Sequence, residues 1–267
     1  MKAIGTSPGI AVGKALVYKE PELSVDLKEV YNIDFEIDRL NSAIEKSNKE
    51  IQDLYEEALK NIGEDEAQIF AAHKMILEDP EFIDRVKLKI KEERVNAEWA
   101  VKEISQQFME MFKGIEDEYL RERALDLKNV SKILLRKLLG IKSRDIRVIR
   151  EKCILVAEDL TPSDTVQINK DMVMGFVTEL GGKTSHTSIV ARILEIPAVA
   201  GAKDITSIAK DGDYMIIDGS EGLILLNPIE EEIRIYEEKK KKYDEFKQRI
   251  RKMKGQESIS KDGVKVE

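Results

Sequence analysis

The stretch from Glu179 to Gly201, ELGGKTSHTSIVARILEIPAVAG, contains one of only two histidines in this 267-residue chain. This histidine, His186, follows a Gly-Gly pair and has small hydroxyl residues on both sides. Imidazole is the side chain whose ordinary pKa leaves a neutral, nucleophilic nitrogen available near pH 7. The pattern therefore makes His186 a candidate acceptor of a phosphoryl group.

The neighbouring residues predict that His186 stands in the first turn of a helix. The Gly-Gly pair ends the preceding strand, and Thr184 or Ser185 is a suitable N-cap. A helix N-terminus presents free N–H groups and the positive end of the helix dipole, so it favours an anion. A phosphoryl group there would carry about two negative charges, which the hydroxyls and the Lys183 ammonium group can contact.

A zinc site fits this histidine poorly, because no second histidine or cysteine lies near it in the sequence. Zinc is held by three or four nitrogen, sulfur or oxygen ligands. The local sequence leaves two interpretations of His186 open, a reactive residue or a capped structural histidine.

Composition limits the classes of partner. The chain is 42% apolar and 36% charged, with a formal net charge of −8, which is typical of a folded, helix-rich protein. The acidic balance argues against a nucleic-acid partner. The apolar runs are shorter than the ~20 residues of a membrane-spanning helix, and residues 1–14 do not resemble a signal peptide. We expect a cytoplasmic protein without a membrane partner.

Two further compositional features bear on the source and on redox chemistry. The single cysteine, Cys153, lies in an apolar run, so a disulfide framework is excluded and a buried, unreactive thiol is expected. The high content of Lys, Glu, Arg and Ile favours a thermophilic source.

Residues 33–142 place apolar residues at helical spacing and contain one proline. This pattern predicts four main helices, the second of them broken at Pro80. Their expected bounds are 34–61, 65–92, 96–114 and 117–138. The region is therefore predicted to be an all-α domain.

Residues 145–228 change to short apolar runs bounded by turns, a pattern typical of strands. The expected strands are 153–157, 174–178, 198–200, 214–218 and 222–226, the last two forming a hairpin. The expected short helices between them are 162–169 and 186–194, and a turn is expected near 204–208. Such alternation indicates an α/β domain, whose sheet residues 1–20 are expected to complete with a strand at 15–18.

The helical region is thus predicted to be an insertion into an α/β domain formed by residues 1–20 and 145–228. A long charged helix is expected at 229–256. Residues 257–267 resemble the opening of a further domain.

At this point the sequence becomes specific to a family. GGKTSHTSIVAR followed by LEIPAVAG resembles the phosphohistidine signature of phosphoenolpyruvate-utilising enzymes, which include Enzyme I of the bacterial sugar phosphotransferase system, pyruvate phosphate dikinase and phosphoenolpyruvate synthase. Four other stretches resemble the N-terminal half of Enzyme I: SPGIAVGKA at 7–15, IFAAHKMILEDPEF at 69–82, DEYLRERALDLKNVSKILLRKLLG at 117–140 and AEDLTPSDTVQ at 157–167. A dikinase or synthase domain fits less well, because those enzymes lack the helical insertion and carry glycine-rich nucleotide loops.

The resemblance implies an α/β phosphohistidine domain with an inserted all-α helical-bundle domain, followed by a linker helix. It implies a phosphoenolpyruvate-protein phosphotransferase, which moves a phosphoryl group from phosphoenolpyruvate through a histidine to the carrier protein HPr. His186 would be the acceptor, and the hydroxyl of Thr165 would orient its ring. The residues that precede the acceptor in the signature are carried over with it: Gly182, Lys183, Thr184 and Ser185. Lys183 replaces the usual arginine, so a point charge replaces a bidentate contact.

The inserted helices resemble the HPr-docking domain. The docking positions that the resemblance implies are Glu64, Asp65, Ile69, His73, Met75, Ile76 and Glu81, with Arg123 and Lys128 from a later helix. Acidic residues beside exposed apolar ones suit a carrier with a basic rim and an apolar patch.

The family also has a C-terminal phosphoenolpyruvate-binding barrel, with Mg²⁺ ligands and the dimer interface, that this sequence does not include. We therefore expect no metal or cofactor in these residues, a monomer in place of the homodimer of the full-length enzyme, and reversible exchange with phosphorylated HPr alone. A binding module that has lost transfer is the rival interpretation.

Overall fold

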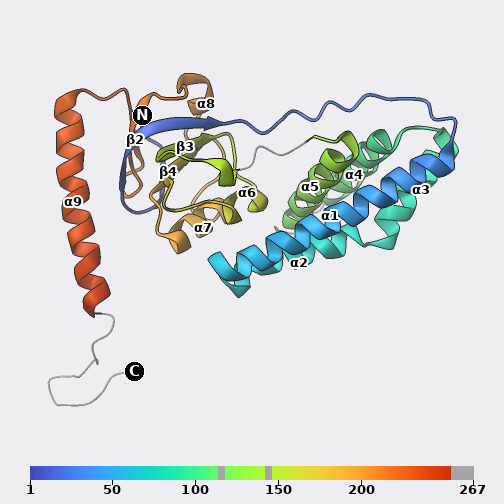
Figure 1. Cartoon of the computed structure of the whole chain (residues 1–267), viewed down its shortest axis with the longest axis horizontal. Helices are drawn as coiled ribbons and strands as arrows, with labels where there is room; N and C mark the ends of the chain where they lie inside the picture. The colour runs from blue at the N-terminus through green and yellow to red at the C-terminus, as the bar shows by residue number, and fades with distance from the viewer. Residues whose placement is uncertain (114–117, 142–145, 254–267) are drawn as a thin grey trace, which may run out of the picture. The chain divides into compact units, whose positions relative to one another are not determined.

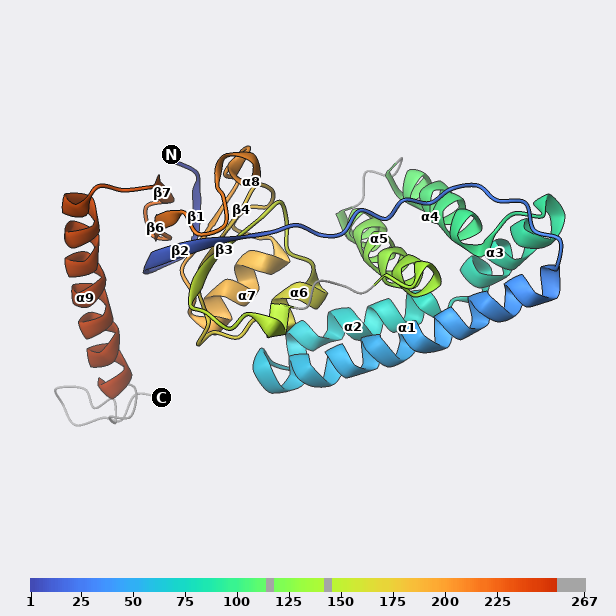
Figure 2. The same ribbon diagram turned by 45° about the horizontal axis from the view of Figure 1, so that its top comes forward.

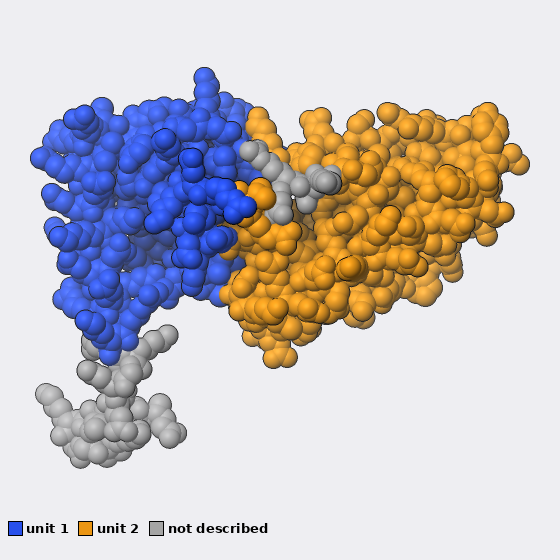
Figure 3. Space-filling view, in the orientation of Figure 1, with its two compact units in different colours: residues 1–18, 149–160, 169–267 blue, residues 19–148, 161–168 orange. Residues whose placement is uncertain are grey.

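A computed structural model describes residues 1–113, 118–141 and 146–253 of the chain. It divides into two compact units, coloured separately in Figure 3. The α/β unit consists of residues 1–18, 149–160 and 169 onward. The helical unit consists of residues 19–148 and 161–168.

The α/β unit is built on a seven-stranded sheet with the order β1-β5-β4-β3-β2-β6-β7. Its strands are β1 (Ile4–Ser7), β2 (Ile10–Tyr18), β3 (Cys153–Ala157), β4 (Val173–Thr178), β5 (Ala198–Ala200), β6 (Tyr214–Asp218) and β7 (Leu223–Leu226). The four central strands β2 to β5 pair in parallel, and β1, β6 and β7 join antiparallel. Every residue of β3 is buried, which explains its uninterrupted apolar sequence.

The strands expected at 153–157, 198–200 and 214–218 are confirmed, as is the hairpin of β6 and β7. The N-terminal prediction was too short. Strand β2 already begins at Ile10, and β1 precedes it across a turn at Gly9, whose φ of +127° only glycine adopts readily. Small residues at Ala11 and Gly13 hid this strand from a pattern based on apolar alternation.

Helices cover the sheet. Helix α7 (His186–Leu194) packs against β1 and β5, α8 (Ile205–Ile208) against β3, and α9 (Glu230–Met253) against β2 (Figure 1). One face of the sheet forms a core with α8, in which Ile154, Val156 and Ile205 are fully or almost fully buried. The long charged helix that was predicted after the sheet is confirmed, since α9 runs from Glu230 to Met253. No helix among the described residues is long and apolar enough to cross a membrane.

In the described part of the helical unit there are five main helices, which confirms an all-α insertion. They are α1 (Ile33–Asn61), α2 (Glu64–Leu77), α3 (Pro80–Glu93), α4 (Ala97–Lys113) and α5 (Glu118–Leu139). A short 3-10 turn (Ile146–Val148) and helix α6 (Pro162–Val166) complete it. The break between α2 and α3 lies where Pro80 predicts it. Asp79 caps α3 by accepting a hydrogen bond from the Glu81 N–H at 2.8 Å.

Helix α6 groups with the helical unit, whereas its sequence placed it in the α/β domain. It packs against α1, and the Asn61 side chain donates a hydrogen bond of 3.3 Å to the Val166 carbonyl. All five residues of α6 are buried. Alternation of strands and helices is a local signal, and it does not reveal which element a short helix packs against.

The connection between β2 and α1 runs alongside the helices as an extended segment (Figures 1 and 2). Asn96 fixes it from the start of α4. The Asn96 amide accepts a hydrogen bond from the Lys28 N–H at 2.9 Å and donates one to the Asp26 carbonyl at 3.2 Å. Val25 of the same segment is buried. The segment is thus a packed part of the helical unit.

Candidate functional site

The turn that leads to His186 leaves the carboxyl end of β4 and is fixed by the neighbouring strand. The Glu179 N–H donates to the Ala157 carbonyl at 3.1 Å, and the Leu180 N–H donates to the Glu158 carbonyl at 2.9 Å. Gly181 follows with a φ of +92°, a conformation that glycine reaches without strain. The conformation of the turn between β4 and α7 thus favours glycine at position 181, whereas Gly182 has no positive φ and has room for a side chain.

His186 is the first residue of α7, as predicted, and its side chain is half-buried. Ser185 is the N-cap, and its hydroxyl oxygen accepts from the Ser188 N–H at 3.4 Å. The same hydroxyl lies 2.9 Å from the Gly182 carbonyl. The imidazole therefore stands at the positive end of a capped helix, where a negative charge is stabilised.

The other signature residues surround this turn. Thr184 and Lys183 are exposed, and the position that a side chain at Gly182 would occupy has no heavy atom within 4 Å. The local structure thus gathers Gly182, Lys183, Thr184 and Ser185 within one turn of His186.

Two further side chains tie this turn and α7 to other segments of the α/β unit, a role that the sequence did not predict for either of them. The Thr187 hydroxyl donates to the Leu160 carbonyl at 2.9 Å. The Arg192 guanidinium donates to the Lys183 carbonyl at 3.0 Å and to the Thr6 carbonyl at 3.1 Å. Arg192 therefore fastens the backbone of the turn.

Glu179 also has a structural role. Its carboxylate accepts hydrogen bonds from the Thr206 N–H, at 2.8 Å, and from the Thr206 hydroxyl. It thereby holds the first turn of α8 to the end of β4. A carboxylate is suited to this place because the first turn of a helix has unpaired N–H groups.

Thr165 belongs to the helical unit, and its side chain is fully buried in α6. Its hydroxyl donates to the Pro162 carbonyl at 3.0 Å. Thr161 and Asp164 form a capping box that starts this helix. Because Thr165 and His186 belong to different units, the orienting role of Thr165 stays a prediction.

Most of the expected docking positions lie on the surface of the helical unit. Glu64, Asp65, Met75, Glu81 and Lys128 are exposed, and the remaining ones apart from His73 are partly buried: Ile69, Ile76 and Arg123. Met75 on α2 is 68% exposed and Leu125 on α5 is 55% exposed. Sequence reasoning missed Leu125, although its place between Arg123 and Lys128 was a signal.

His73 does not belong to this surface, and its assignment there was wrong. The imidazole is fully buried. Its Nε2 lies 3.4 Å from a carboxylate oxygen of Asp126 on α5, and its ring meets the edge of Phe70 at 5.8 Å between centroids. Position 73 lies on the inner face of α2, because residues 70, 73 and 77 follow helical spacing and are all buried.

Cys153 is buried at the start of β3, and burial raises the pKa of its thiol to about 11. The thiol therefore stays protonated at neutral pH. In the part of the chain that the structure describes, no group of three or more His, Cys, Asp and Glu side chains is placed to hold a metal ion.

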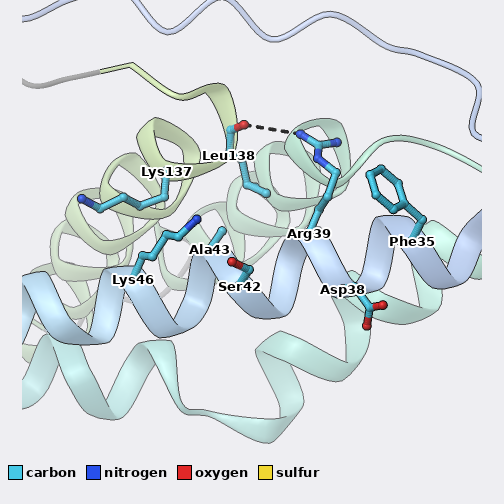
Figure 4. A pocket seen from close by; sticks show the side chains of 8 residues that line it. All are labelled: Phe35, Asp38, Arg39, Ser42, Ala43, Lys46, Lys137 and Leu138. Carbon is cyan, nitrogen blue, oxygen red and sulfur yellow. Dashed lines mark hydrogen bonds between the residues drawn. The ribbon is translucent and has the colours of Figure 1, made fainter.

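A hollow of about 330 Å³ lies on the helical unit, between α1 and the end of α5 (Figure 4). Its lining residues are Phe35, Asp38, Arg39, Ser42, Ala43, Lys46, Lys137 and Leu138. Two of its cations are already paired. Arg39 binds Glu36 at 2.7 Å and Glu98 at 2.5 Å, and Lys137 binds Glu50. These pairs join α1 to α4 and α5, and no residue of the predicted site lines the hollow.

Comparison with family models places two matches on the chain. The model described as "PEP-utilising enzyme, N-terminal" matches residues 2–123. The model described as "PEP-utilising enzyme, mobile domain" matches residues 149–222, which include the turn at His186.

Curated relatives include two proteins named phosphoenolpyruvate-protein phosphotransferase. The protein of Bacillus subtilis (strain 168) is 44% identical over 267 residues, which is 100% of this chain and 47% of the relative. That of Geobacillus stearothermophilus is 42% identical over 264 residues, which is 99% of this chain and 46% of the relative. The chain thus spans about half the length of the curated relatives it matches.

Solved structures similar to this chain include an NMR structure of Enzyme I (nEIt), with a TM-score of 0.80 and 42% sequence identity. The alignment covers 91% of this chain and 99% of that one. A structure described as the N-terminal domain of Enzyme 1 - Nitrogen has a TM-score of 0.60 and 27% identity, over 89% of this chain and 98% of that one.

Proposed function

Because the chain belongs to the Enzyme I family of phosphoenolpyruvate-protein phosphotransferases and corresponds to their N-terminal part, we propose that His186 carries the phosphoryl group in transfer to the carrier protein HPr. The observation that supports this most is the position of His186 as the first residue of a capped helix, directly after the Gly-Gly turn. An anion bound to the ring would lie at the positive end of that helix.

For the exchange with HPr, a neutral ring nitrogen of His186 attacks the phosphorus of the phosphohistidine on HPr. The phosphorus–nitrogen bond to HPr breaks as the new one forms, and the electron pair leaves with the imidazole of HPr. Each ring keeps the proton on its other nitrogen, so no external acid or base is needed. Catalysis then depends on positioning and on stabilising the charge of the transferred group.

Three groups of this chain could stabilise the negative charge of the transferred phosphoryl group. The N-terminus of α7 supplies partial positive charge, Lys183 supplies an exposed ammonium group, and Thr184 supplies an exposed hydroxyl. We assign to Thr165 the task of orienting the imidazole through its hydroxyl, as hydrogen-bond partners of a reactive histidine do. This last role requires Thr165 and His186 to meet during the reaction.

The reaction with phosphoenolpyruvate is part of the same proposal for the full-length protein. There the phosphorus–oxygen bond of phosphoenolpyruvate breaks, and the enolate that leaves takes up a proton to become pyruvate. We assign Mg²⁺ and the phosphoenolpyruvate site to parts of the relatives that this chain does not span. The residues described here supply the acceptor and the carrier-docking surface.

The proposal is tested by mixing this chain with phosphorylated HPr and measuring its intact mass at mildly alkaline pH. We expect a single phosphoryl adduct that is lost when the sample is acidified, since a phosphorus–nitrogen bond hydrolyses in acid. The adduct should disappear when unphosphorylated HPr is added in excess. No adduct, with HPr still bound in a titration, would leave a docking module and overturn the proposal.

The docking surface is proposed to lie on α2 and α5, around the exposed side chains of Met75 and Leu125. Glu64 and Asp65 start α2 and are exposed. Acidic side chains beside large exposed apolar ones fit a basic rim around an apolar patch on HPr. The same acidic groups would speed encounter at low salt.

Met75→Ala is expected to raise the Kd for HPr by roughly 5- to 30-fold, because truncating a buried interface anchor typically costs about 1–2 kcal/mol. The maximal transfer rate should not change. Met111→Ala on α4 is the matched control, since Met111 is 58% exposed and Met75 is 68% exposed. Equal affinities of both variants in calorimetric titration would contradict this placement of the surface.

A further inference from the structure

The first turn of α7 is joined by a buried hydrogen bond to the segment that follows β3. Thr187, the residue after His186, is buried, and its hydroxyl donates to the Leu160 carbonyl at 2.9 Å. Leu160 is itself buried, and its N–H is fixed by the Asp159 carboxylate at 2.8 Å. The bond therefore joins two segments of the α/β unit that are 27 residues apart in sequence.

This hydrogen bond fixes the residue directly after His186, in the same helical turn. Successive residues of a helix are turned by about 100° around its axis, so an inward Thr187 sets the direction in which His186 points. The Ser185 cap is local and lies within the same turn. Further along α7, Val190 and Ala191 are fully buried and keep the helix on the sheet. The Thr187 hydroxyl thus tethers the first turn of α7, while Arg192 fastens the turn that precedes it.

We propose that Thr187 is a positioning residue for phosphoryl transfer at His186. This inference rests on the function proposed above. In-line attack needs the ring nitrogen about 3–3.5 Å from phosphorus, and a displacement of about 1 Å can slow a reaction roughly 100-fold. The tether restricts the rotation and tilt of the first turn, and so holds the imidazole on the line of attack. The hydroxyl itself does not touch the phosphoryl group.

The test compares two substitutions that differ in the hydroxyl. Thr187→Val keeps the branched shape of the side chain but removes the donor, whereas Thr187→Ser keeps the donor. We expect the maximal rate of phosphoryl uptake from phosphorylated HPr to fall about 10- to 100-fold in Thr187→Val. It should stay within about threefold of the wild type in Thr187→Ser. The KM for phosphorylated HPr should be unchanged in both, because the proposed docking residues belong to the helical unit.

A general loss of stability is controlled for by Thr6→Val. Thr6 is also buried in the α/β unit, and its hydroxyl donates to the Ala198 carbonyl at 3.2 Å. It makes the same kind of bond within the sheet, and Thr6→Val leaves unchanged the Thr6 backbone carbonyl that accepts from Arg192. If Thr6→Val slows transfer as much as Thr187→Val does, or if Thr187→Val transfers at the rate of the wild type, the inference is overturned.

NMR gives a readout that does not depend on turnover, because the chain has only two histidines. The ring signals of His186 should shift or broaden in Thr187→Val and keep their wild-type positions in Thr187→Ser. Those of His73 should stay in place in both variants. An unchanged His186 spectrum in Thr187→Val would count against the tether. If the wild type takes up no phosphoryl group, the proposed function itself fails, which is a different outcome from equal rates in wild type and variant.

Discussion

His186→Gln is expected to abolish phosphoryl uptake from phosphorylated HPr and to leave the affinity for HPr within about twofold of the wild type. The amide nitrogen of glutamine is not a nucleophile, so the covalent route closes completely. His186 is half-buried at the start of α7, and glutamine has a similar volume and fits a first helical turn. The fold and the docking surface should therefore persist.

Two measurements on the same samples separate binding from chemistry. Intact-mass spectrometry should show no adduct on His186→Gln, and a calorimetric titration should show HPr binding as in the wild type. A variant that still gains a phosphoryl group would mean that another residue is the acceptor. A variant that neither binds HPr nor melts like the wild type would show that His186 is structural.

Glu36→Gln is expected to reduce the free energy of unfolding of the helical unit by about 2–4 kcal/mol. Glu36 is buried, and one of its oxygens lies 2.7 Å from Arg39 and accepts a hydrogen bond of 2.7 Å from the Ala97 N–H. The Glu36 carboxylate thus both caps α4 and forms an ion pair with Arg39. Removing one partner from a buried ion pair typically costs about 3–5 kcal/mol, and glutamine recovers part of this by accepting one bond.

The matched control is Glu81→Gln, which breaks an exposed pair between Glu81 and Arg85 at 2.8 Å. Such pairs contribute about 0.3–0.5 kcal/mol, so its unfolding midpoint in urea should hardly move. Trp99 of α4 is the only tryptophan in the chain, so its fluorescence reports on the helical unit. Equal midpoints for both variants would contradict the structural role of Glu36.

The same network predicts a pH dependence. Burial raises the pKa of Glu98, but hydrogen bonds from its own N–H, from Arg39 and from Asn96 outweigh burial and lower it below the usual 4.5. A carboxyl group with a lowered pKa stabilises the folded state above its unfolded pKa and loses this contribution as the pH falls. The urea concentration at which half of the wild-type protein is unfolded should therefore decrease as the pH is lowered below about 4.5. The drop should be smaller in Glu98→Gln.

The parts of the fold that follow local rules could be predicted from the sequence. Helix α1 was expected at 34–61 and runs from Ile33 to Asn61. The start of α3 was marked by Asp79 and Pro80, whose capping chemistry lies within two residues. The start of α7 followed from the same kind of reasoning at Ser185. Caps, turns and periodicity are short-range signals, so their sequence patterns are sufficient.

The errors concern features that depend on distant partners. His73 was placed on the docking surface because the resemblance to Enzyme I implies it, yet the imidazole is fully buried beside Asp126 of α5 and Phe70. The roles of Glu179 and Thr187 were missed because their partners, Thr206 and Leu160, are 27 residues away in each case. The residue type alone does not disclose such a partner.

The central pairing of the sheet joins β2 to β3, with Lys14 opposite Cys153, across the whole inserted helical region. Helices form from near neighbours within microseconds to milliseconds, whereas a strand pair so far apart in sequence must await the closure of a long loop. Prior collapse of the insertion shortens that loop and lowers its entropic cost. We therefore expect the insertion to gain its structure first and the pairing of β2 with β3 to form later.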